Sequence, residues 1–190
     1  VVCFDERPCQ LLDNVLMPIP MKPGRIERED YHYKRNGTAV VLMAVEPLAG
    51  YRIVRVTEQK TKKDYAEFMK CLSSHYPNAE KIVLVQDNLN THNPSSFYET
   101  FDAQDAFELS QRFEFVYTPK KASWLNMAEI ELSALSKQCL DRRIAQRRIL
   151  TKEVMTWSGK RNRLRTKITW QFTKNIAREK LGRHYNIIRD

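Results

Sequence analysis

The chain has 190 residues, of which 42% are hydrophobic, so it is long enough for one domain with a sizeable core. No apolar run reaches the ~18 residues that a membrane span needs, and we expect no membrane partner. The net charge is +9. Residues 142–190 carry 15 Lys and Arg against three Asp and Glu, a balance of +12, whereas residues 1–141 are slightly acidic. This distribution is typical of a nucleic-acid binder; the alternative is a solvated basic helical surface.

The four cysteines lack the spacing of a zinc site, and they predict free thiols in a reducing cytosol. The chain has no signal-peptide pattern at its start. It opens inside an apparent strand without an initiator Met. We therefore expect a fragment of a longer protein.

The first half of the chain is rich in strand patterns. Residues 1–4 are apolar and predict a short strand that ends at Asp5. Residues 7–37 hold four prolines and many charges, which predicts a long connection. Residues 38–46 and 51–58 are two β-rich runs joined by a Pro-Leu-Ala-Gly turn, typical of a hairpin.

Helices and strands then alternate. Thr61 is expected to cap a helix that Pro77 ends. Residues 82–85, Ile-Val-Leu-Val, predict a strand buried on both faces. Residues 94–112 predict one helix, and residues 113–118 predict a fifth strand. The candidates for burial on that helix are Phe97, Phe101, Phe107 and Leu109.

The clearest helix covers residues 126–140, with an apolar stripe at i, i+4, i+7 and i+11. Glu129 and Glu131 lie at opposite borders of this stripe, about 160° apart. Thr151 is expected to open another helix, and residues 173–181 a last short one. The element order predicts an α/β fold, a mixed five-stranded sheet flanked by helices, with a basic helical C-terminal segment.

Three acids stand at central places in this order: Asp5, Asp87 and Glu129. An acid at the carboxyl end of a strand lies where open α/β sheets bind ligands. Gathered without a cation, carboxylates repel by ~4 kcal/mol for a pair 4 Å apart at an effective dielectric of 20. The pattern therefore predicts a magnesium site, with two ions suited to phosphoryl transfer. The alternative is three unrelated acids, at a strand end, in a turn and in a helix capping box.

Three blocks carry a resemblance to a known family. They are Val2-Cys-Phe-Asp-Glu6, Val83-Leu-Val-Gln-Asp-Asn-Leu-Asn-Thr-His92 and Tyr117-Thr-Pro-Lys-Lys-Ala-Ser-Trp-Leu-Asn-Met-Ala-Glu129. In this order they resemble the signature blocks of DDE transposases, and more narrowly those of the bacterial insertion-sequence branch of the mariner superfamily. The resemblance covers nearly the whole chain.

The resemblance implies a ribonuclease-H-like fold and cutting and rejoining of transposon-end DNA with Mg²⁺ or Mn²⁺. It assigns the catalytic and metal-binding roles to Asp5, Asp87 and Glu129, rather than Glu131. It divides the chain into a catalytic domain, residues 1–141, and a basic segment, residues 142–190, that completes it. We expect this fragment to lack the family's amino-terminal DNA-binding domain.

Other residues are expected to support this site or to bind DNA. Asn88 orients Asp87 or a metal-bound water, or it only forms a turn. His92 matches a family position, but as a lone histidine it favours a structural role. Asn126 is expected to cap the helix before Glu129. The expected DNA-binding residues are basic: Arg142, Arg143, Arg147, Arg148, Lys160 and Arg161. In mariner relatives, the region between the first two strands includes a loop that clamps the partner subunit, so we expect residues 7–37 to protrude and to pack against another chain or DNA. We therefore expect a homodimer on double-stranded DNA, in the bacterial cytoplasm at the nucleoid.

Two other classes of protein remain open at this point. One is a different ribonuclease-H-fold nuclease, such as a resolvase or an RNA–DNA hybrid nuclease. The other is a non-catalytic DNA-binding module derived from a transposase. The presence of all three acids argues against the second class.

Overall fold

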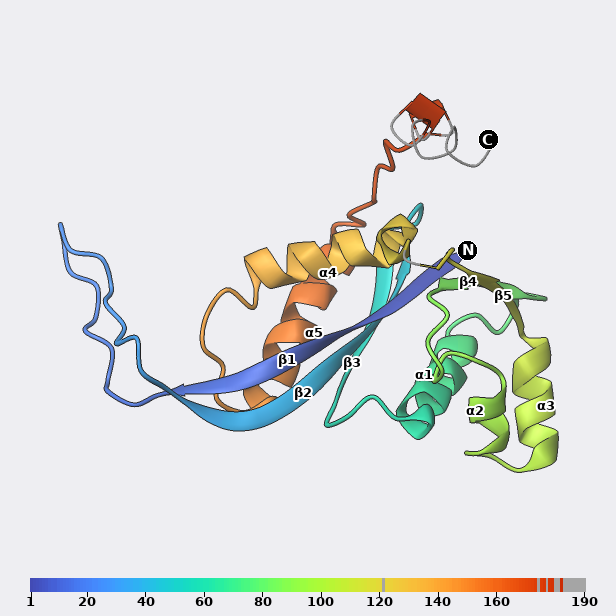
Figure 1. Ribbon diagram of the computed structural model, residues 1–190, viewed down its shortest axis with the longest axis horizontal. Helices are drawn as coiled ribbons and strands as arrows, with labels where there is room; N and C mark the ends of the chain where they lie inside the picture. Colours follow the sequence, from blue (N-terminus) through green and yellow to red (C-terminus); the bar gives the residue numbers. More distant parts are fainter. Residues whose placement is uncertain (121, 174, 177, 180–181, 183–190) are drawn as a thin grey trace, which may run out of the picture.

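The computed structural model describes residues 1–120, 122–173, 175–176, 178–179 and 182. Five strands form one mixed sheet in the order β3-β2-β1-β4-β5, in which β1 is antiparallel to β2 and parallel to β4 (Figure 1). The strands are β1 (Val2–Asn14), β2 (Tyr33–Glu46), β3 (Tyr51–Thr57), β4 (Ile82–Gln86) and β5 (Phe113–Tyr117). The helices are α1 (Lys62–Ser74), α2 (Ser95–Tyr98), α3 (Ala103–Gln111), the short 3-10 helix η1 (Ser123–Leu125), α4 (Met127–Gln138) and α5 (Arg147–Arg163). The mixed five-stranded sheet is the one that the sequence predicts.

The sheet is covered on both faces, and β2 shows how. Val40, Leu42 and Ala44 pack in the cluster that includes α1, α2 and α3. The alternate residues Ala39, Val41 and Met43 pack with α4 and α5. Since successive side chains of a strand point to opposite faces, a strand buried on both must be apolar at every position. β2 is apolar at each of these positions and is therefore buried on both faces.

The long connection predicted over residues 7–37 is wrong at both ends. β1 continues to Asn14 and β2 begins at Tyr33, so Asp5 lies within a strand and not at its end. Only Val2 and Cys3 pair with β4, which leaves the rest of β1 as an edge strand. Prolines and charges are tolerated at such an edge, which explains why Pro8 misled the prediction.

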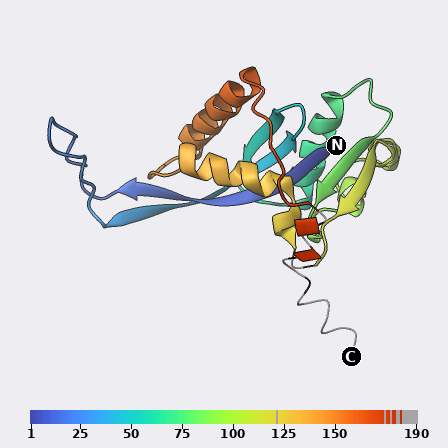
Figure 2. The same ribbon diagram turned by 90° about the horizontal axis from the view of Figure 1, so that it is seen from above.

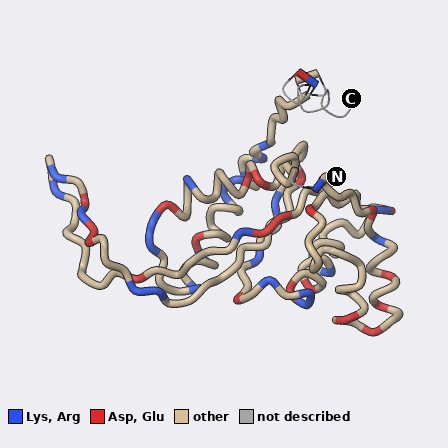
Figure 3. The backbone as a smooth tube through the Cα atoms, viewed as in Figure 1, with Lys and Arg blue, Asp and Glu red and all other residues tan. Residues whose placement is uncertain are grey.

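Residues 15–32, which we call the arm tip, connect the two strands. Two isolated bridges, Ile19 with Arg28 and Lys22 with Arg25, continue the hairpin toward its end. Figures 1 and 2 show the hairpin as an arm that extends well away from the body. Lys and Arg are mixed with Asp and Glu along it (Figure 3).

Three smaller expectations are also corrected. In β4 only alternate residues, Ile82, Leu84 and Gln86, are buried, so the strand is not buried on both faces. The helix expected over 94–112 is broken into α2 and α3, because extended Asp102 caps α3 by accepting from Asp105 N–H at 2.9 Å. Phe107, which was expected to be buried, is exposed.

The carboxyl-terminal part completes the core. α5 begins at Arg147 and not at Thr151, and its residues Leu150, Val154 and Trp157 are buried against β2 and α4. The last helix expected, over residues 173–181, lies partly outside the described residues. In the part of the chain that the structure describes, the four cysteines are free and no helix is long and apolar enough to cross a membrane.

Candidate active site

Asp5 and Asp87 come from neighbouring parallel strands. β1 pairs with β4 through Val2 with Leu84 and Cys3 with Val85. Asp5 and Asp87 each follow two residues beyond the last of these pairs, so the same register carries them to the same level of the sheet. Parallel pairing of β1 and β4 therefore accounts for the proximity of two acids 82 positions apart in the sequence.

Glu129 reaches the same place through the start of α4. Asn126 is fully buried, and its amide nitrogen donates to Phe4 O on β1 at 2.7 Å. Its side-chain oxygen accepts from Ala128 N–H at 3.1 Å and so caps α4. Asn126 thus fixes the helix start beside the strand of Asp5, and Glu129 is exposed in the first turn. The expected capping role of Asn126 is observed.

The carboxyl group of Asp5 is buried and lacks a complete set of partners. Oδ1 accepts from Glu6 N–H at 2.8 Å, whereas Oδ2 is buried with no hydrogen-bond partner among the described residues. Burial raises the pKa of Asp5 to about 7, although the bond from Glu6 N–H partly offsets this. The negative charge of Glu129 raises the pKa further, with smaller effects from Glu6 and Asp87.

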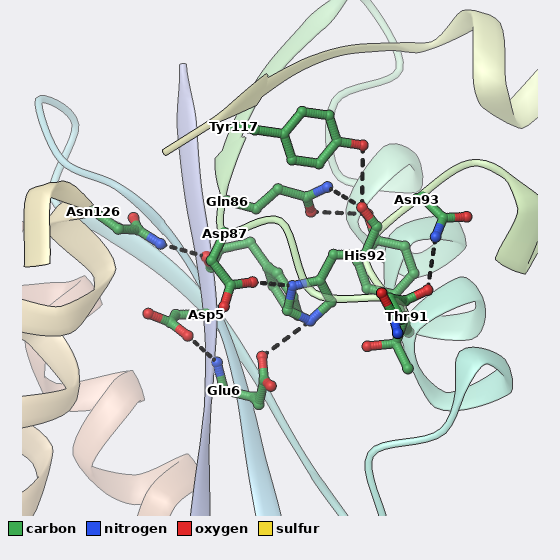
Figure 4. A network of polar contacts seen from close by, with 12 residues as sticks. Asp5, Glu6, Gln86, Asp87, Thr91, His92, Asn93, Tyr117 and Asn126 are labelled. Atoms are coloured by element: carbon green, nitrogen blue, oxygen red, sulfur yellow. Dashed lines mark hydrogen bonds and ion pairs between the residues drawn. The ribbon is translucent and has the colours of Figure 1, made fainter. Parts of the chain in front are cut away.

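His92 joins two acids of the site (Figure 4). Its Nδ1 lies 2.5 Å from Asp87 Oδ1, and its Nε2 lies 3.0 Å from Glu6 Oε2. Burial alone would lower the pKa of His92, but the bonds to Asp87 and Glu6 raise it to about 9. In turn, the bond from His92 holds the pKa of Asp87 below its usual range. We call Glu6, His92 and Asp87 the His92 bridge.

Glu131 is in a different environment, although only one residue separates it from Glu129 in the sequence. It is 1% exposed, and Arg52 Nε lies 2.7 Å from its Oε1. Arg161 donates to both carboxylate oxygens, at 2.5 and 3.1 Å. Glu131 therefore ties α4 to β3 and α5, while Glu129 is the acid whose charge acts on Asp5. This geometry supports Glu129 as the third acid of the site.

A divalent cation fits the chemistry of this donor set. No group of three or more His, Cys, Asp or Glu among the described residues is already arranged to hold an ion. The buried Asp5 Oδ2 nevertheless lacks a partner, and the surrounding acids repel its ionised form. Carboxylate oxygens are the ligands that Mg²⁺ and Mn²⁺ prefer, so Asp5, Asp87 and Glu129 would hold such an ion.

A cavity of about 380 Å³ opens beside Glu129. Glu6, Arg7, Ser133, Ser136 and Lys137 line it together with Glu129. A second cavity, of about 840 Å³, lies between α4 and α5 and shares Lys137 with the first. Its basic lining residues include Arg142, Lys160 and Arg161. Asp141 and Glu153 also line it, so its basic residues outnumber its acids by four to two.

The six expected DNA-binding residues divide into two groups. Four already have acidic partners: Arg142 with Glu153, Arg143 with Glu29, Arg147 with Glu58 and Arg161 with Glu131. Arg143 also donates to Asn14 Oδ1 and to two backbone carbonyls of the arm tip. Arg148 and Lys160 are exposed, with no ion pair to a described residue. Asn88 is likewise exposed, and the described residues give its side chain no hydrogen bond.

Several residues of the site were not predicted from the sequence. Glu6 was part of the first block, but nothing in its spacing indicated contact with His92. Gln86 is fully buried and links Tyr65 OH, at 2.8 Å, to His92 O, also at 2.8 Å. Arg52 and its pairing with Glu131 were missed as well. An arginine in an apolar β-run is the signal that would have found it.

The sheet order and the three acids define a nuclease-like α/β domain, and comparisons identify its family. Residues 1–151 match the model of the DDE superfamily endonucleases, so the chain belongs to that family. This superfamily generally uses divalent metal ions. A comparison with curated proteins finds no match.

Among solved structures, the chain is similar to the crystal structure of the Mos1 strand transfer complex, with a TM-score of 0.56 and 13% sequence identity. The match covers 83% of this chain and 46% of the Mos1 chain, so the present chain spans about half of that length. The ribonuclease-H-like fold that the sequence predicted is thereby confirmed.

Proposed function

We propose that the chain is the catalytic domain of a transposase that cuts and rejoins double-stranded DNA at transposon ends. The observation that carries this proposal is the meeting of Asp5, Asp87 and Glu129, from β1, the end of β4 and α4, with the buried Oδ2 of Asp5 left without a hydrogen-bond partner. Family membership supports the same chemistry. We propose Mg²⁺ or Mn²⁺ as the cofactor, with two ions.

The roles of the residues follow from their surroundings. Bound divalent ions supply Lewis acidity at the phosphate that is attacked. Asp5, with a pKa raised to about 7 by burial, must lose its proton before it serves as a ligand. Asp87 is already ionised, because the bond from His92 lowers its pKa. Exposed Glu129 lines the cavity in which a DNA phosphate has room, and Lys137 and Arg7 offer positive charge there.

We further propose membership of the bacterial insertion-sequence branch of the mariner superfamily, with action in the bacterial cytoplasm at the nucleoid. The ordered blocks that end at His92 and at Glu129 support this narrower assignment. Sequencing the DNA on both sides of the gene tests it, because an insertion sequence is bounded by inverted repeats. Their absence would remove this assignment without affecting the nuclease chemistry.

The catalytic proposal is tested by nicking and end cleavage in Mg²⁺ and in Mn²⁺. We expect Asp87→Asn to abolish cleavage while DNA binding persists, because Asn keeps the shape and turn bonding but loses the charge. A turn residue alone would tolerate Asn. Glu114→Gln, at an exposed acid on β5, is the control and should cleave normally.

Three results would contradict the proposal. Full cleavage by Asp87→Asn would remove the acid from the mechanism. Preference for an RNA–DNA hybrid over duplex DNA would identify a different nuclease. DNA binding without nicking in Mn²⁺ would identify a non-catalytic module.

We also propose that the arm tip packs against a second copy of the chain. Its apolar side chains are exposed, including Met17 at 90%, Met21 at 72% and Ile26 at 79%. Apolar side chains favour a protein surface over a phosphate backbone. Replacing these three residues with Glu should shift sedimentation toward the monomer, whereas Leu48→Glu, at another exposed position, should not. An unchanged dimer, or a monomeric parent protein, would contradict the proposal.

A further inference from the structure

His92 uses both ring nitrogens at once, on acids from two different strands. Nδ1 contacts Asp87 Oδ1 at 2.5 Å, and Nε2 contacts Glu6 Oε2 at 3.0 Å. The side chain of His92 is 3% exposed, and that of Glu6 is 6% exposed. A histidine kept only to fill the core needs neither acid, and an apolar residue would cost less to bury.

The ring is held firmly by its surroundings. It stacks on Tyr65, with centroids 5.1 Å apart and planes at 27°. The ring of Phe4 meets it at 5.2 Å and 77°. Behind the ring, His92 O accepts from Gln86 Nε2 at 2.8 Å and from Tyr117 OH at 3.1 Å. Since α1 and β1 pack against the ring while residues of β4 and β5 hold the backbone carbonyl of His92, we expect the acids to adjust to the ring rather than the reverse.

The sheet faces show what the ring does for the site. On β1, Phe4 packs in the cluster of α1, while Cys3 packs on the other face with Ala128 of α4. By alternation Asp5 lies on the α4 side with Glu129, and Glu6 lies on the side of α1. His92 therefore holds Oδ1 of Asp87 from the α1 side. The second oxygen of Asp87, Oδ2, is outside this contact and can face Asp5.

We propose that His92 is a positioning residue, which holds the Asp87 carboxylate in the orientation in which Asp87 and Asp5 bind a divalent cation together. The inference rests on the proposed function and adds the residue that sets the geometry of its metal site. Loss of a group that hydrogen-bonds a metal-binding carboxylate typically lowers metal affinity by roughly 10–100-fold. Glu6 is the anchor of the bridge, and Lys60 lies 3.4 Å from Glu6 Oε1.

A competing role makes the opposite prediction. If the ring merely stood in for a cation beside Asp87, the metal would have to displace it. Removing the ring would then tighten metal binding. The sign of the change in affinity separates the two roles, and a purely structural histidine would change stability but not affinity.

The test is Mn²⁺ binding to the metal-free protein, measured without DNA from the paramagnetic resonance signal of free Mn²⁺. His92→Gln, whose amide nitrogen corresponds to Nε2, loses the contact with Asp87 and should weaken binding roughly 10–100-fold. His92→Asn, whose amide nitrogen corresponds to Nδ1, keeps that contact and should retain most of the affinity. His75→Asn, at an exposed histidine after α1, is the matched control.

The outcomes decide the proposal. Equal affinity in both His92 variants and the parent, or tighter binding in either variant, overturns it. If thermal unfolding shows that the His92 variants do not fold, Glu6→Gln serves instead, because it leaves the stacked ring in place. That variant should bind Mn²⁺ more weakly, and unchanged binding again overturns the inference.

Failure of the proposed function would look different. A parent protein that binds Mn²⁺ through Asp5 and Asp87 but cuts no DNA would overturn the transposase proposal and leave the role of His92 standing. A parent protein that binds no Mn²⁺ overturns both.

Discussion

Two groups of charged residues meet at α4, and they are built in opposite ways. At Glu131 one buried carboxylate is flanked by two arginines, Arg52 and Arg161. Around Glu129 the acids Asp5, Glu6 and Asp87 gather, while Arg7 and Lys137 line the same cavity without an ion pair to a described residue. His92 and Lys60 contact only Glu6 and Asp87. The first group is electrostatically complete, whereas the second is short of positive charge.

This difference indicates which of the two groups binds a ligand. Removing an acid from the complete group leaves a buried arginine without compensation, which harms folding. Removing an acid from the deficient group relieves repulsion, so the folded chain loses little. The acid cluster lowers the stability of the metal-free protein, and a bound cation would offset this repulsion. This difference supports a structural role for Glu131 and the proposed catalytic role for Glu129.

The largest expected effects come from replacing each of the two glutamates with glutamine. Glu129→Gln should reduce strand cleavage by about 10³-fold or more, since charge stabilisation by metal ions is worth several kcal/mol. Its unfolding free energy should stay close to that of the parent. Glu131→Gln should instead lower the unfolding free energy by about 3–5 kcal/mol, because Arg52 stays buried and loses its partner.

Cleavage rates and urea unfolding of both variants check this pair. Arg52→Met is the control, because it removes the buried cation and leaves Glu131 with Arg161. If charge compensation determines stability here, Arg52→Met should lower the unfolding free energy less than Glu131→Gln does. Loss of cleavage only in a fully folded Glu131→Gln protein would show that the two roles are reversed.

Much of this arrangement was predictable from local patterns, and the limits have physical causes. Strand and helix periodicities drew attention to Asp5, Asp87 and the two glutamates of α4, and the resemblance to DDE transposases selected Glu129 over Glu131. The arm was missed because β1 leaves the sheet interior after Cys3, and an edge strand tolerates the prolines and charges that normally indicate a loop. The bonds of His92 to Glu6 and of Arg52 to Glu131 join distant segments, and such contacts leave no local spacing in the sequence.

A second prediction uses the pH dependence of the metal-free protein. The folded pKa of Asp5 is about 7, against an ordinary value of 3.8. A carboxyl group with a raised folded pKa stabilises fully below its unfolded pKa, and this contribution is lost as the pH rises toward 7. Urea unfolding in a chelator should therefore show that Asp5→Asn becomes more stable than the parent between pH 4 and 8. The gain should approach a few kcal/mol, at most about 4.

Two comparisons sharpen this result. Asp13→Asn changes an exposed acid on the same strand and should show no such trend with pH. Saturating Mn²⁺ should stabilise the parent at high pH, because the ion binds the ionised carboxyl group of the folded state. A difference between Asp5→Asn and the parent that does not vary with pH would mean that Asp5 is not destabilised by its neighbours.

The smallest expected effect extends the same comparison to the basic surface. Arg148 and Lys160 are exposed without an acidic partner among the described residues, whereas Arg143 is occupied by Glu29 and the arm tip. If the segment from Arg142 onward contacts about five phosphates, log affinity should fall with log salt at a slope near −4.5, from ~0.9 per contact. The double substitution of Arg148 and Lys160 with Ala should make that slope shallower by ~1.8.

Arg143→Ala should leave the salt slope nearly unchanged and instead loosen the arm, seen as faster amide exchange at its base. A slope that changes with Arg143 but not with the exposed pair would mean that DNA displaces the internal partners of these side chains, and the division into complete and deficient groups would then fail at this surface.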